Sequence, residues 1–211
     1  MRIIRGPLQI IRADLRTYLV LNAVTYGIVL AGFGAGLLFP DLTSARVEAL
    51  ENDGTAELVR TLLATPWLFA ATILGVNIVS VGLLRLLLPS LVLPFAGLAV
   101  FWFWTATTGV ALVPTSDIGW VAMIPHSLTV VIEFQAYIVI AFGAYLLGRA
   151  WLRPRTVDAV NRRQAYARGL QRIGWLAIPA SLLLVVGAIY EALSLAYLVG
   201  PLSIAILGTT P

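Results

Sequence analysis

The chain has 211 residues, of which 60% are hydrophobic and only 11% are charged. A soluble domain carries about 25% charged residues, so this composition excludes an ordinary water-soluble fold and predicts one integral membrane domain. Cysteine is absent, which excludes disulfides, thiolate metal sites and a cysteine nucleophile. The basic residues, all of them arginine, flank apolar segments. Anionic lipid headgroups are therefore the expected partner, and nucleic acid is not.

Residues 1–16 have the pattern of an amphipathic helix. Aliphatic side chains fall on one face at helical spacing, and arginines fall on the other. We predict that this helix lies at the membrane interface; the alternative is a solvated extension of the first span. Its basic face carries Arg2, Arg5, Arg12 and Arg16.

Residues 17–211 are expected to form a transmembrane domain, because five apolar segments are each long enough to cross a bilayer. A helix rises about 1.5 Å per residue, so a hydrocarbon core of roughly 30 Å needs about 20 residues. The predicted fold is an all-α, polytopic membrane helix bundle of five transmembrane helices behind an N-terminal amphipathic interfacial helix. The spans are expected at about 17–39, 66–88, 91–113, 122–148 and 174–199.

Two spans contain small residues four positions apart, a spacing that lets helices approach closely. The first span has Gly32 and Gly36, and the fourth has Ala144 and Gly148. We expect these faces to pack within the chain rather than to drive dimerisation. The oligomeric state stays open.

The arginines indicate the orientation. If the chain crosses five times, 12 of its 14 arginines fall on one side, and the other side holds most of the acidic residues. Basic loops stay in the cytoplasm. We therefore predict a multi-pass protein of the cell membrane with its N-terminus in the cytoplasm and its C-terminus outside.

Two loops are candidates for contacts with other molecules. The acidic outer loop 40–65 is expected either to meet an extracytoplasmic partner or to pack as a lid on the bundle. The inner loop 151–173 is expected to contact lipid headgroups or a cytoplasmic partner. Its arginines include Arg153, Arg155, Arg162 and Arg163.

Several polar residues fall inside the predicted spans. An ionised carboxylate at mid-membrane costs several kcal/mol, so Glu133 and Glu191 should be protonated, paired or exposed to an aqueous cavity. His126 and Glu133 are seven residues apart, which places them within about 20° on one helix face. We expect one polar cluster in the outer half of the bundle, formed by Asn77, His126, Glu133, Tyr137 and Glu191.

The favoured role of this cluster is structural, through interhelical hydrogen bonds of about 0.6–2 kcal/mol each. A proton or solute path and an intramembrane catalytic site are the alternatives. The chain has one histidine, no zinc-hydrolase spacing and no glycine-rich phosphate loop with lysine. We therefore predict no enzyme activity, no cofactor and no metal site.

The same residues lie in short motifs whose order and depth resemble a known family. The motifs are Asn77-Ile-Val-Ser-Val, Ile124-Pro125-His126, Glu133-Phe-Gln-Ala136 and Ala188-Ile-Tyr-Glu191-Ala. Together with the five-span layout, they resemble the stage II sporulation protein M family. Ser127 stands where that family has glycine and Gln135 where it has proline, and the interval from histidine to glutamate is longer. These differences indicate a distant branch.

The resemblance implies a scaffold, because the sporulation member anchors a complex of peptidoglycan-degrading enzymes at the membrane. The expected function is a non-catalytic membrane scaffold that recruits other membrane or envelope proteins. The alternatives are a small-solute or proton-linked transporter and the membrane subunit of an ATP-driven exporter.

Overall fold

The computed structural model describes the backbone of residues 2–208 and the side chains of residues 5–208 except Ala56. Every regular element in this range is helical, which confirms the all-α prediction. The elements are α1 (Arg2–Ala13), α2 (Leu15–Leu38), α3 (Pro40–Asn52), α4 (Thr55–Leu63), α5 (Pro66–Val76), the π-helix η1 (Asn77–Leu87), α6 (Leu88–Val92), α7 (Ala96–Ala111), α8 (Asp117–Leu152), the 3-10 helix η2 (Pro154–Val157), α9 (Arg162–Tyr197) and α10 (Val199–Leu207).

Four helical stretches in the described part of the chain are long and apolar enough to cross a membrane, so the chain is a multi-pass membrane protein. They correspond to the first, second, fourth and fifth predicted spans. Their bounds are Leu15–Leu38, Pro66–Val92, Asp117–Leu152 and Arg162–Tyr197.

The third predicted span, 91–113, corresponds to a shorter apolar helix, the 16-residue α7. Its expected start was wrong, because residues 91 and 92 still belong to α6. Between α6 and α7, Pro94 is followed by Phe95, whose positive φ of 66° is incompatible with a continuing right-handed helix. The chain therefore turns at 93–95, and α7 starts at Ala96.

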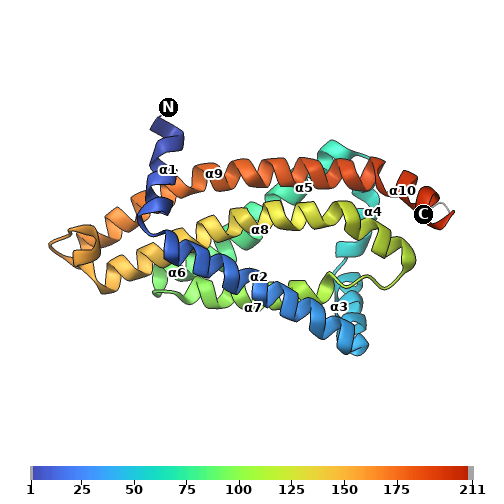
Figure 1. Cartoon of the computed structure of the whole chain (residues 1–211), viewed down its shortest axis with the longest axis horizontal. Coiled ribbons are helices and arrows are strands. Elements are labelled where there is room, and N and C mark those ends of the chain that lie inside the picture. The colour runs from blue at the N-terminus through green and yellow to red at the C-terminus, as the bar shows by residue number, and fades with distance from the viewer. Residues whose placement is uncertain (1, 209–211) are drawn as a thin grey trace.

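Helix α8 is the centre of the bundle. In its most apolar stretch 67% of the residues are buried, compared with 28% in α2. Helix α9 runs along α8, while α2 and α7 pair on the other side of α8 (Figure 1). Large apolar side chains such as Leu30, Trp67, Phe103 and Leu182 are exposed on the outer faces, as expected for surfaces solvated by lipid.

The pairing of α2 with α7 depends on glycines. A Cβ atom at Gly32 would lie 2.3 Å from the Ala106 carbonyl oxygen, and one at Gly109 would lie 2.4 Å from that of Val29. Only glycine allows the two backbones to approach so closely. The expectation that the small residues pack within the chain is therefore confirmed for Gly32.

Short helices lie across both ends of the bundle (Figure 1). At one end α1 crosses α9, and Gly6 packs on the ring of Trp175. At the other end α3 and α4 form the predicted outer loop, where Leu62 is buried in a cluster with Phe69 and Ala192. This packing agrees with the lid alternative, while the acidic side chains of α3 and α4 remain exposed.

The hairpin formed by α8 and α9 is longer than a membrane requires. Each helix has 36 residues and is therefore about 54 Å long, against a hydrocarbon core of roughly 30 Å. Their connected ends project beyond α2, α6 and α7 (Figure 1). Much of the predicted inner loop 151–173 is consequently helix, since α9 begins at Arg162.

Candidate functional site

The structure brings Asn77 and Glu133 into direct contact. Asn77 is buried at the start of η1, and its Nδ2 donates a hydrogen bond to Glu133 Oε1 at 2.5 Å. Glu133 also packs on α9, where a Cβ atom at Gly187 would lie 2.9 Å from its Cγ. One carboxyl side chain of α8 therefore touches both η1 and α9.

The other two polar residues pair with each other, two turns from Glu133 along α8 and one turn from Gly187 along α9. His126 Nδ1 lies 3.4 Å from Glu191 Oε1, and the two side chains are 26% and 16% exposed. Gly187 and Glu191 are four residues apart and so share a face of α9. The side chain of Glu133 thus packs on α9 one turn from Glu191. We call Asn77, His126, Glu133 and Glu191 the acidic cluster.

Tyr137 borders the acidic cluster but belongs to the aromatic core. Its side chain is only 1% exposed. Its ring centroid lies 5.6 Å from that of Trp104, 5.8 Å from that of Phe134 and 6.0 Å from that of Phe101. The ring packing accounts for its burial, and Tyr137 lies one turn of α8 from Glu133.

A long π-helix carries one side of the acidic cluster. Most π-helical segments are single turns and are frequent at functional sites, whereas η1 extends over 11 residues from Asn77. Near its end, Arg85 is half-buried and donates a hydrogen bond to Ser80 Oγ, with its guanidinium 5.9 Å from the centre of the Trp104 ring. Sequence reasoning placed Arg85 among the inner-face arginines and missed this position, although a lone arginine in an apolar span is a signal for it.

The acidic cluster reaches a cavity at the end of the bundle where α3 lies. This cavity of 340 Å³ is lined by His126 together with residues from α3, α8, α9 and the α7–α8 connection. His126 is therefore the member of the cluster that is closest to solvent on that side.

A second polar cluster lies on the opposite face of α8, and sequence reasoning missed it. Gln135 Nε2 donates hydrogen bonds to Asn22 Oδ1 at 2.7 Å and to the Tyr26 hydroxyl at 3.0 Å. Gln135 Oε1 accepts one from the Tyr18 hydroxyl at 3.0 Å. We call Tyr18, Asn22, Tyr26 and Gln135 the amide cluster. Its signal in the sequence is the four-residue spacing of Tyr18, Asn22 and Tyr26 within an otherwise apolar span.

The arginines predicted to contact headgroups or partners lie at the end of the bundle where α1 and the α8–α9 turn are found (Figure 1). The side chain of Arg2 lies outside the described residues. The remaining seven are all exposed: Arg5, Arg12, Arg16, Arg153, Arg155, Arg162 and Arg163.

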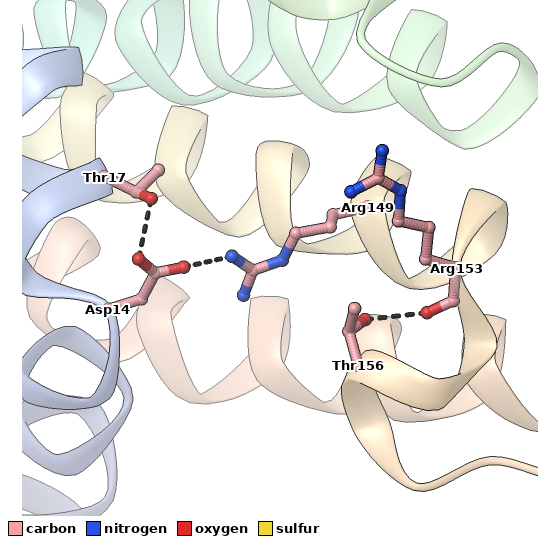
Figure 2. Close-up of polar contacts among 5 residues, drawn as sticks. All are labelled: Asp14, Thr17, Arg149, Arg153 and Thr156. Carbon is pink, nitrogen blue, oxygen red and sulfur yellow. Dashed lines mark hydrogen bonds and ion pairs between the residues drawn. The ribbon is translucent and has the colours of Figure 1, made fainter.

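An ion pair ties the α1–α2 junction to α8 at this end. The carboxylate of Asp14 accepts hydrogen bonds from Thr17 and from Arg149 (Figure 2). Partial burial acts to raise the pKa of Asp14, but the hydrogen bonds from Thr17 and Arg149 and the charge of Arg149 outweigh burial and lower this pKa below 3.8. Asp14 is therefore ionised at neutral pH.

The chemistry available in these clusters is hydrogen bonding and proton exchange. Among the described residues, no three histidine, cysteine, aspartate or glutamate side chains are grouped so that they could hold a metal ion. Comparison of the chain with protein-family models, curated proteins and solved structures gave no match.

Proposed function

We propose that the chain is a five-span protein of the cell membrane that recruits partner proteins and catalyses no reaction itself. The observation that carries this proposal is the α8–α9 hairpin, which projects beyond its neighbours (Figure 1). Its connected end presents the exposed side chains of Arg153, Arg155, Arg162 and Arg163. A rigid helical projection with unburied charges suits the binding of another protein better than the conversion of a substrate.

The proposed orientation puts α1 and the connected end of the hairpin on the cytoplasmic side and α3 and α4 outside, with α7 as the third crossing. Basic segments at one end and acidic segments at the other support it. Because the chain has no cysteine, single substitutions give a clean labelling test. A membrane-impermeant thiol reagent applied from outside should label Asp53→Cys and Asp117→Cys but not Arg155→Cys. The reverse pattern would contradict this topology.

The polar contacts inside the bundle support a structural role for the protein. In the acidic cluster and in the amide cluster, polar side chains from different helices bond to one another. Such bonds hold helices in a fixed arrangement where lipid offers no hydrophobic driving force. The resemblance to the stage II sporulation protein M family also supports a scaffold.

Co-purification tests the scaffold directly. The tagged full-length chain would be extracted from its host in a mild detergent, and bound proteins would be identified by mass spectrometry. We expect a partner that is retained by wild type and lost from Arg162→Gln/Arg163→Gln. The matched control is Arg12→Gln/Arg16→Gln, which removes the same charge from the end of α1 and the start of α2 and should retain the partner. Equal recovery with all three chains would refute recruitment by the hairpin.

A proton-linked carrier is the second candidate, and the outer cavity that reaches His126 favours it. In this case His126, Glu191 and Glu133 would take up protons from the outer side. Complementation in the native host distinguishes the two candidates, because Glu133→Gln preserves a hydrogen-bonding group but cannot exchange a proton. Normal complementation by Glu133→Gln supports the scaffold, and its loss in a folded variant supports the carrier.

A further inference from the structure

A basic cleft lies between α1, the turn that follows α8, and the first half of α9. It has a volume of 640 Å³, within the range of about 300–1,000 Å³ typical of small-molecule sites. Three arginines from two helices line it: Arg149 of α8 and Arg168 and Arg172 of α9. Asp14 is the one carboxylate in this lining.

Positive charge in the cleft exceeds what the protein itself neutralises. Asp14 is paired with Arg149 (Figure 2), and Arg149 Nε is buried without a hydrogen-bond partner. Arg168 donates to the carbonyl oxygen of Val157 but forms no ion pair with the described residues. Arg168 and Arg172 thus line the same cleft, and neither forms an ion pair with a carboxylate among the described residues.

Arg172 is the third arginine of the cleft. It is half-buried, and the charges of Arg149 and Arg168 both act on it. Asp158 acts on it in the opposite sense, but makes no ion pair with it in the described structure and does not line the cleft. Holding like charges together in a partly desolvated cleft is unfavourable unless an anion binds between them.

The remaining lining supplies neutral hydrogen-bonding groups and an aromatic wall. The amides of Gln9 and Gln171 and the hydroxyl of Thr156 border the cleft, and Trp175 lies beside them. Helix α1 separates the cleft from a small apolar hollow that is lined by Leu8 and other residues of its opposite face. The cleft and the apolar hollow therefore lie on different faces of α1.

We propose that this cleft binds a phosphate-bearing anion through Arg149, Arg168 and Arg172. The planar guanidinium fork matches two phosphate oxygens at once, and such charge-assisted bonds are stronger than neutral ones. The phosphate group has two possible sources, a soluble phosphate ester or the headgroup of an anionic phospholipid at the membrane surface. This proposal stands whether or not the hairpin recruits a protein.

The test uses the purified full-length chain in a neutral detergent, with binding measured by calorimetry and thermal unfolding. Inorganic phosphate and glycerol 3-phosphate form the soluble arm; phosphatidylglycerol in mixed micelles, against phosphatidylcholine, forms the lipid arm. We expect one arm to bind wild type and raise its melting temperature. Binding should weaken about tenfold or more in Arg172→Gln, as expected when a charge-assisted bond is lost.

Two further variants keep the test decisive. Arg60→Gln removes the same charge from an exposed position of α4, at the opposite end of the bundle from the cleft, and should bind like wild type. Arg172→Lys keeps the charge without the fork, so it should fold and bind between wild type and Arg172→Gln. The proposal is overturned if neither arm binds wild type, or if Arg60→Gln weakens binding as much as Arg172→Gln does. Binding in the soluble arm identifies a phosphate ester, and binding in the lipid arm alone identifies a headgroup.

Discussion

The acidic cluster and the amide cluster use opposite faces of α8 at the same depth. Glu133 and Gln135 are two residues apart and so differ by about 200° around the helix. Glu133 faces η1 and α9 through Asn77 and Gly187, whereas Gln135 faces α2 through Tyr18, Asn22 and Tyr26. The two side chains nearly match in shape but differ in their ability to titrate.

Because of this difference, the amide cluster can only hold helices together, whereas the acidic cluster can also exchange protons. The amide cluster consists of neutral donors and acceptors, and Gln135 uses both ends of its side chain, so it is a permanent link between α2 and α8. The acidic cluster contains two carboxyl groups and an imidazole, and a cavity reaches it from the end of the bundle where α3 lies. A change of protonation can alter the acidic cluster without affecting the amide cluster, which makes it the place where a function beyond packing would reside.

Gln135→Leu is expected to have the largest effect on folding. It removes the three hydrogen bonds that link Gln135 to Tyr18, Asn22 and Tyr26 of α2. At about 0.6–2 kcal/mol per interhelical bond, the free energy of unfolding should fall by about 2 kcal/mol or more. Thermal unfolding in detergent measures the change, with Ser127→Ala, at an exposed position of α8, as the control. A melting temperature equal to that of wild type would mean that the amide cluster does not hold α2.

Glu133→Leu is expected to have the second-largest effect on folding. It removes the bond from Asn77 and leaves that buried amide unpaired next to α9. Leaving a buried polar group unsatisfied costs about 1–3 kcal/mol, and one interhelical bond is lost rather than three. The melting temperature should therefore drop, but less than in Gln135→Leu. If Glu133→Leu is as stable as wild type, Glu133 does not hold the bundle together.

Gln135→Glu should destabilise the protein by a smaller amount. The substitution replaces the amide nitrogen that donates to Asn22 and Tyr26 by an oxygen, while the hydroxyl of Tyr18 keeps its acceptor. We expect a loss of about 1 kcal/mol, on the scale of one or two interhelical bonds. Thermal unfolding of Gln135→Glu and Gln135→Leu, measured side by side, shows which variant loses more stability. A loss in Gln135→Glu that equals or exceeds the loss in Gln135→Leu would contradict this prediction.

The two clusters also show which features of the fold and the site can be predicted from the sequence. Hydropathy located the four long apolar helices, because crossing a bilayer is a matter of length and polarity. Asn77, His126, Glu133 and Glu191 were predictable because a polar residue inside an apolar span is expensive and needs a partner.

The remainder depends on contacts that no local pattern encodes. Gln135 meets Tyr18 across 117 residues of chain, so its role follows from helix packing. The break at Phe95 depends on a backbone conformation that hydropathy does not record. The π-helical winding that places Arg85 over Trp104 likewise depends on tertiary packing.

Glu133→Gln is the reverse of Gln135→Glu, and we expect it to have the smallest effect on stability. Glutamine keeps a side-chain oxygen that can accept the hydrogen bond from Asn77 Nδ2, and it preserves the contact with Gly187. The free energy of unfolding should stay within about 0.5 kcal/mol of wild type, the usual range for a change that breaks no contact. Melting temperature and complementation in the native host would be measured on the same variant. If the variant is stable and complements, the role of the acidic cluster is to hold helices together, like that of the amide cluster. A stable variant that fails to complement shows that Glu133 must titrate, and that the two faces of α8 serve different purposes.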